Sequence, residues 1–237
     1  MALCLRCYEA LPWLGKGLRE SHSPAGSTKT LALLSFEGEA RDWIHRFKYP
    51  APGLMGLDPG ARGVMRMLTR AASQVAEIRS SDWIVPVPVH PRRFRERGFN
   101  PSALLAREVA RARANPVESR WLSRVRETLP QAGLDAASRR RNVMDAFACR
   151  PRTGPLPERV WLLDDVTTTG ATLAAAATTL RGAGIREVRA LCLARTPRPG
   201  EEVLQGARAA GEAGPIPSGR VPSRKLPPEA WRDPRVS

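Results

Sequence analysis

Two adjacent carboxylates precede a hydroxyl-rich glycine turn in the stretch VWLLDDVTTTGAT, from Val160 to Thr172. Asp164 and Asp165 follow a short, continuous apolar run, which is the pattern of a central parallel strand covered on both faces. An alanine-rich helix is predicted from Leu173 to Leu180, so unpaired amide groups and a helix dipole converge on the turn before it. The turn therefore suits a phosphate group, and the acids suit ribose hydroxyls or Mg²⁺.

The turn itself offers hydroxyl donors and a glycine that lets the backbone approach a ligand closely. The predicted phosphate-binding residues are Thr167, Thr168, Thr169, Gly170, Ala171 and Thr172. A simpler interpretation is that the acids and threonines only cap the helix, because Asp and Thr are both favoured at N-cap positions.

The stretch around the acid pair and three further stretches of the chain resemble known sequence motifs. The string DDVTTTGAT resembles the 5-phosphoribosyl-1-pyrophosphate signature of type I phosphoribosyltransferases. Upstream, IVPVPVHPRRFRERGFN (84–100) and FEGEARDWIHRFKY (36–49) resemble the ComF-type family of competence-associated, phosphoribosyltransferase-like proteins. The segment 124–149 matches that family's pattern at Arg124, Arg126, Thr128, Gln131, Arg141, Asn142 and Phe147. The matches follow the family's order and cover about 36–196.

The expected fold class is α/β, with a type I phosphoribosyltransferase-like parallel sheet flanked by helices. The alternation of elements agrees with this expectation, because strands that alternate with helices form parallel sheets with right-handed crossovers. Ligands of such sheets gather at the carboxyl ends of the strands. Helices are predicted at 37–48, 61–78 and 101–114, and strands at 83–87 and 187–194, besides the strand that begins at Val160.

The resemblance implies that the chain transfers a phosphoribosyl group from 5-phosphoribosyl-1-pyrophosphate to a nitrogenous acceptor. Asp164 and Asp165 would be the catalytic pair, stabilising positive charge on the ribose and holding the cofactor Mg²⁺ directly or indirectly. The loop Pro88, Val89, His90 would bind pyrophosphate, with Arg92 and Arg97 as clamps. The segment 124–142 would be a mobile hood that excludes water, with Arg124, Arg126 and Arg141 binding substrate.

Two residues near these motifs have competing interpretations. His90 could act as a general base, but a histidine before a proline in a basic loop favours a hydrogen-bonding or surface role. Lys48 could touch the substrate, but a lysine of an amphipathic helix is more often extended along the surface with its ammonium in water.

Basic charge is concentrated beside the predicted site. The chain has a net charge of +15, and the segment 91–152 contains fifteen arginines and six acidic residues. These arginines suit pyrophosphate, because the guanidinium fork matches phosphate geometry. They equally suit a solvated basic face or a single-stranded DNA track. The alternative function is therefore a non-catalytic ComF-like protein in DNA uptake, which binds single-stranded DNA and uses the pocket as a ligand sensor.

The ends of the chain differ in composition from its middle. Residues 1–30 are predicted to form a short appendage, 31–196 a phosphoribosyltransferase-like domain, and 197–237 a disordered tail rich in proline and glycine. Cys4 and Cys7 form half of a zinc site with only His22 nearby, so a degenerate zinc finger is favoured over a bound ion. The sequence shows no bilayer-spanning run or secretory signal, and we expect a cytoplasmic protein.

Overall fold

The computed structural model describes residues 11–14, 19–22, 28–49, 58–126, 145–197 and 203, and its centre is a five-stranded sheet in the order β1-β2-β7-β6-β3. β1 pairs with β2 in the antiparallel direction, and the other neighbours run parallel. The strands are β1 (Arg19–His22), β2 (Lys29–Ser35), β3 (Trp83–Pro86), β6 (Arg159–Thr167) and β7 (Glu187–Arg195). The predicted α/β class, with a parallel sheet flanked by helices, is confirmed.

Three of the described helices, α3, α4 and α5, begin at a residue whose side chain caps the first turn. Asp58 accepts hydrogen bonds from two backbone amides of α3, while His90 caps α4 and Asn100 caps α5. Proline follows each of these three caps, in the turn where a missing N–H costs no hydrogen bond. The helices are α2 (Gly38–Lys48), α3 (Pro59–Val75), α4 (Pro91–Arg97), α5 (Pro101–Arg113) and α7 (Ala171–Gly182).

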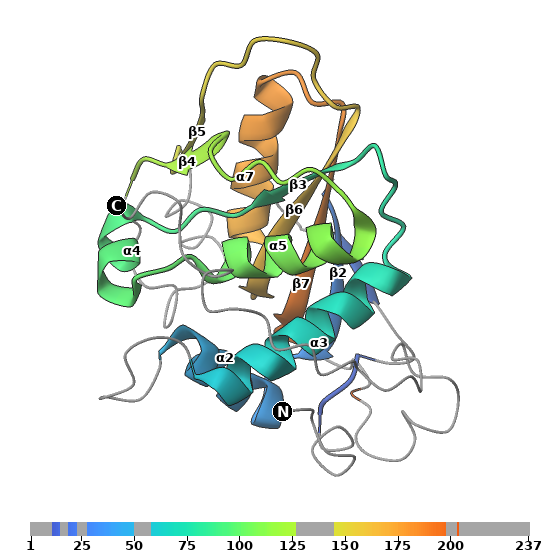
Figure 1. Cartoon of the computed structure of the whole chain (residues 1–237), viewed down its shortest axis with the longest axis vertical. Helices are drawn as coiled ribbons and strands as arrows, with labels where there is room; N and C mark the ends of the chain where they lie inside the picture. Colours follow the sequence, from blue (N-terminus) through green and yellow to red (C-terminus); the bar gives the residue numbers. More distant parts are fainter. Residues whose placement is uncertain are drawn as a thin grey trace.

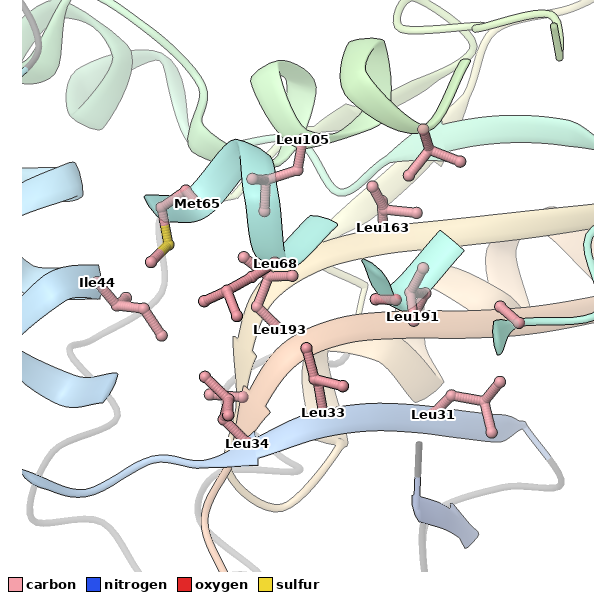
Figure 2. Packing of buried hydrophobic residues seen from close by; sticks show 14 of the residues in the cluster. Leu31, Leu33, Leu34, Ile44, Met65, Leu68, Leu105, Leu163, Leu191 and Leu193 are labelled. Atoms are coloured by element: carbon pink, nitrogen blue, oxygen red, sulfur yellow. The ribbon is translucent and has the colours of Figure 1, made fainter. Parts of the chain in front are cut away.

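The sheet separates two apolar layers. On one face, residues of β2, β6 and β7 pack against α2, α3 and α5, and Figure 2 shows this layer around Leu33, Leu68, Leu105 and Leu193. On the other face, alternate residues of the same strands pack against α7 and the hairpin formed by β4 (Leu122–Arg124) and β5 (Phe147–Cys149). Figure 1 shows the resulting three-layer arrangement. Both faces of β6 are thus buried, as its continuous apolar run predicted.

Two differences from the sequence prediction involve the edges of the sheet. Strand β6 continues two residues past the acid pair to Thr167, so Asp164 and Asp165 lie within the strand, near its carboxyl end. The described part of the predicted appendage joins the domain: β1 pairs with β2, and Leu11, Trp13 and Leu14 are buried in the two core layers. Hydrophobic periodicity does not predict this contribution, because the segment is too short to show a repeating apolar pattern.

The amino-terminal edge of the sheet is held by a buried charged cluster. The Asp82 carboxylate accepts hydrogen bonds from the guanidinium of Arg159 at 2.7 and 3.0 Å and from the indole of Trp161 at 2.9 Å. Asn115 donates to the backbone carbonyl of Asp82 at 2.9 Å. These contacts satisfy polar groups that would otherwise be buried unpaired, and they lie at the opposite end of β6 from the acid pair.

Candidate functional site

The acid pair lies at the carboxyl edge of β6, in the middle of the sheet. In the pairing of β6 with β7, Asp164 lies opposite Cys192, and Val166, which follows the acid pair, lies opposite Ala194. The edge is closed by a backbone bond from Thr196 N to Thr167 O at 3.0 Å. The topology therefore brings this pair to the edge where ligands of parallel sheets bind.

Asp164 is held from a distant helix. The hydroxyl of Ser102, in the first turn of α5, donates to Oδ1 of Asp164 at 2.9 Å, and the backbone N–H of Asp165 donates to the same oxygen at 3.0 Å. Burial and then the charge of Asp165 raise the pKa of Asp164 to about 7, although Lys48 and Ser102 favour the ionised form. This carboxyl is therefore partly protonated at neutral pH.

Asp165 is more deeply buried and is paired with a cation. Its side chain is 7% exposed, and its Oδ2 lies 3.0 Å from Nζ of Lys48, the last residue of α2. Oδ1 accepts a hydrogen bond from the backbone N–H of Val166 at 2.8 Å. The structure thus brings Lys48 into the site, against the interpretation that we favoured from sequence.

The predicted phosphate turn joins the end of β6 to the start of α7. Gly170 is buried with a φ of 76°, a left-handed conformation that favours glycine, and α7 begins directly after it. Because Gly170 is the N-cap, it supplies no side chain to the first turn, where Thr169 Oγ1 accepts from Ala171 N at 3.4 Å. Thr167 is buried at the end of β6 and Thr168 is exposed. Thr172 lies in the first turn of α7.

The predicted pyrophosphate loop lies beside the acid pair at the same edge. β3 pairs with β6 up to Pro86 and Leu163, and Val87 N donates to Leu163 O at 2.8 Å. Pro88, Val89 and His90 follow this contact and are all partly exposed. The His90 Nδ1 accepts from Arg92 N at 3.3 Å as the cap of α4, which agrees with the hydrogen-bonding role that the sequence favoured.

The predicted arginines are not all brought to the acid pair. Arg124 is close enough for the Asp164 charge to favour its ionised form, although burial lowers the pKa of its guanidinium. Arg92 bonds Glu96 at 3.1 Å on exposed α4, and Arg97 donates to the hydroxyl of Tyr49. Arg126 is exposed at the end of the described segment 58–126. Arg141 lies outside the described residues, as does most of the predicted hood.

The sequence did not predict Ser102 as a site residue, and it favoured a surface role for Lys48, which instead contacts Asp165. Ser102 follows Asn100 and Pro101 at a helix start, where serine reads as part of a cap. The sequence did carry a signal for Ser102, because β3, the strand that precedes α5 in the chain, ends at the same edge of the sheet as β6. Asn100 confirms this placement, since its side-chain amide donates to Val87 O at 3.1 Å.

Metal ions in proteins are usually bound by clusters of His, Cys, Asp and Glu side chains. The part of the chain that the structure describes contains no group of three or more of these side chains that could hold a metal ion. Cys4 and Cys7 lie outside the described residues, so the degenerate zinc finger stays a prediction. Among the described helices, none is long and apolar enough to cross a bilayer.

By sequence, the chain is similar to a competence protein and to DNA utilization proteins. No family model matches it. It is 33% identical over 153 residues to competence protein F of Haemophilus influenzae, a match that covers 64% of this chain and 66% of that protein. It is 39% identical over 115 residues to the DNA utilization protein YhgH of Salmonella typhi, covering 48% of this chain and 50% of that protein. The resemblance to ComF-type proteins is thereby confirmed.

A solved structure also shows partial similarity. The allosteric regulatory enzyme of purine biosynthesis superposes with a TM-score of 0.41 at 22% identity, over 62% of this chain and 29% of the enzyme. The chain spans about half to two thirds of the relatives that it matches by sequence.

Proposed function

We propose that this protein binds 5-phosphoribosyl-1-pyrophosphate together with Mg²⁺ in the cytoplasm and transfers the phosphoribosyl group to a nitrogenous acceptor. The observation that supports it best is the order of groups along β6 and α7. Two carboxylates near the end of β6, Asp164 and Asp165, are followed, after four intervening residues, by the left-handed Gly170 and the N-terminus of α7. A ribose 5-phosphate could meet the acids with its hydroxyls and the helix start with its phosphate.

Each part of the site has a defined task in this proposal. The turn from Thr167 to Thr172 binds the 5-phosphate through backbone N–H and hydroxyl donors. Asp164 and Asp165 accept hydrogen bonds from the ribose hydroxyls and orient the sugar. As pyrophosphate departs from C1, the ring gains positive charge, and the nearby carboxylates stabilise it. The acceptor nitrogen attacks C1 from the face opposite the leaving pyrophosphate, and Arg124 lies close enough to add positive charge near the acids.

The donor set of the site fits Mg²⁺. The ion prefers oxygen ligands and usually keeps several waters, binding through one or two carboxylates and substrate phosphates. The described site offers two adjacent carboxylates, and Asp165 Oδ2 is buried with no hydrogen bond among the described residues and lies 3.0 Å from the Lys48 ammonium. Asp164 and Asp165 would hold Mg²⁺, directly or through water, and the ion would neutralise charge on the leaving pyrophosphate.

Calorimetry with 5-phosphoribosyl-1-pyrophosphate and Mg²⁺ tests the binding half of the proposal. We expect saturable binding that depends on Mg²⁺ and is lost in the double variant Asp164→Asn plus Asp165→Asn. Unchanged affinity in that variant would overturn the site assignment. A pyrophosphate-release assay with a panel of nitrogenous bases and amines then tests turnover and identifies the acceptor.

A second candidate function is binding of single-stranded DNA without catalysis. The names of the relatives and the arginine-rich segment 91–152 both favour it. The described part of that segment exposes Arg92 and Arg95 on α4. Binding through phosphates would show little sequence preference and a steep loss as salt rises.

Fluorescence anisotropy with a labelled oligonucleotide separates the two candidates. We expect the triple variant Arg139→Ala, Arg140→Ala, Arg141→Ala, which lies outside the described residues, to weaken DNA association. Competition by 5-phosphoribosyl-1-pyrophosphate would place the DNA track at the pocket. Binding that does not respond to salt would contradict an electrostatic track.

A further inference from the structure

The ammonium of Lys48 lies against one carboxylate of the acid pair that we propose to hold Mg²⁺. Its Nζ lies 3.0 Å from Oδ2 of Asp165, and the two side chains are 22% and 7% exposed. The charge of Lys48 also reaches Asp164, whose ionised form it favours. The acid pair therefore already has one positive charge beside it.

The position of Lys48 is set by the packing of its neighbours. Phe47 is buried and its ring meets that of Phe99 at 6.1 Å between centroids. Tyr49 accepts a hydrogen bond from Arg97, whose guanidinium lies 4.6 Å from the centre of the tyrosine ring. The residues on both sides of Lys48 are thus anchored to the connection between α4 and α5. The backbone of Lys48 stays at the site, while its four-carbon stem can still turn.

Lys48 should affect a free divalent metal ion differently from a metal ion that is bound to a sugar diphosphate. A free metal ion that binds Asp165 must separate the ammonium from its carboxylate and leave two cations side by side, at a distance where repulsion is strong in a poorly solvated site. A metal ion that arrives on a sugar diphosphate brings negative phosphate oxygens with it. The displaced ammonium can then pair with those oxygens, as lysines commonly do with phosphates.

We propose that Lys48 is a specificity-determining residue, a resident cation that weakens binding of free divalent metal ions and selects a metal ion carried by a phosphorylated sugar. The part that concerns the sugar rests on the proposed function, whereas the part that concerns free metal depends only on the Lys48–Asp165 contact. Neither part requires Lys48 to act as an acid or a base.

The test measures binding of Mn²⁺ alone, by calorimetry and by the loss of the free-ion electron paramagnetic resonance signal. We expect Lys48→Gln to bind free Mn²⁺ about tenfold more tightly than the native protein, which corresponds to about 1.4 kcal/mol. Lys48→Arg keeps the charge and should resemble the native protein. Adding Asp165→Asn to Lys48→Gln should remove the gain. Equal or weaker Mn²⁺ binding by Lys48→Gln would overturn the inference.

A second measurement keeps this inference separate from the proposed function. Affinity for 5-phosphoribosyl-1-pyrophosphate with Mn²⁺, divided by affinity for Mn²⁺ alone, should fall in Lys48→Gln because the ammonium no longer pairs with phosphate. If the native protein binds no sugar phosphate but Lys48→Gln gains Mn²⁺ affinity, the role of Lys48 against free metal ions is supported and the proposed function is wrong. Lys48→Met, which retains the apolar stem, replaces Lys48→Gln if circular dichroism shows that the latter is unfolded.

Discussion

Ser102 and Asp164 are joined by a hydrogen bond of 2.9 Å, in which the serine hydroxyl donates to the carboxylate across 62 positions of sequence. The bond connects the first turn of α5 to the end of β6 and favours the ionised form of Asp164. A carboxyl whose pKa lies at about 7 is sensitive to such a donor near neutral pH. The serine therefore influences how much of the acid pair is charged when a ligand arrives.

Ser102→Ala should weaken Mg²⁺-dependent sugar phosphate binding at pH 7 by roughly three- to tenfold, because a hydrogen bond to a charged group is lost. The deficit should shrink above about pH 8.5, where Asp164 is ionised with or without the serine. Calorimetry across this pH range checks the result. Ser123→Ala is the matched control, since that hydroxyl donates to Ala148 O in the β4–β5 hairpin at 3.1 Å. A loss that is constant with pH would contradict the role given to Ser102.

Asp164→Asn should stabilise the metal-free protein at pH 8. The folded pKa of about 7 lies above the ordinary value of 3.8, so the native state holds its proton more tightly than the unfolded chain does. The native protein therefore loses stability from this group as pH rises from about 4 to about 7. Asparagine removes that loss, and we expect a gain of about 1–3 kcal/mol at pH 8.

Urea unfolding at pH 5 and pH 8, in the presence of a chelator, measures the effect. The difference in unfolding free energy between variant and native protein should be larger at pH 8 than at pH 5. Carboxylates remote from the acid pair contribute to the native profile, but they are common to both proteins and cancel in the difference. A difference that is equal at the two pH values would show that Asp164 titrates normally.

Alanine at the two end glycines of α7 should have opposite effects on stability. Gly170 has a φ of 76°, so Gly170→Ala forces an L side chain into the left-handed region and should cost about 1–2 kcal/mol. Gly182 is helical, and a Cβ there would meet no atom within 4 Å. Gly182→Ala should stabilise by up to about 1 kcal/mol. Thermal melts check the signs, and only Gly170→Ala should weaken phosphate binding.

Asp82→Ala should destabilise the fold by about 3–5 kcal/mol, because it leaves the buried guanidinium of Arg159 without its principal partner. Below the melting temperature, ligand binding at the opposite edge of the sheet should persist. Glu187→Gln is the control: its carboxylate lies 3.7 Å from Arg159 but is 41% exposed, so its loss should cost less than about 1 kcal/mol. Denaturant midpoints for the two variants give the comparison.

The unit formed by β6, the glycine turn and α7 could be predicted from sequence because all of its signals are local. A continuous apolar run marks a strand that is buried on both faces, adjacent acids mark its polar end, and glycine marks the left-handed turn. Of the other elements, α2, α3, α5, β3 and β7 also followed from the sequence pattern, whereas β1, β2, α4 and the β4–β5 hairpin were not predicted. The order of these elements was enough to predict a parallel sheet and the edge where ligands bind.

The surroundings of the acid pair were decided only by tertiary structure. Lys48 and Ser102 each lie on a helix where their residue types have ordinary surface or capping roles, and only the packing of α2 and α5 against the sheet brings them to Asp165 and Asp164. The charge state of Asp164 likewise depends on burial and on neighbours from separate elements. Sequence determined which groups could perform the chemistry; the three-dimensional fold determined their partners, because contacts between distant segments leave no local pattern.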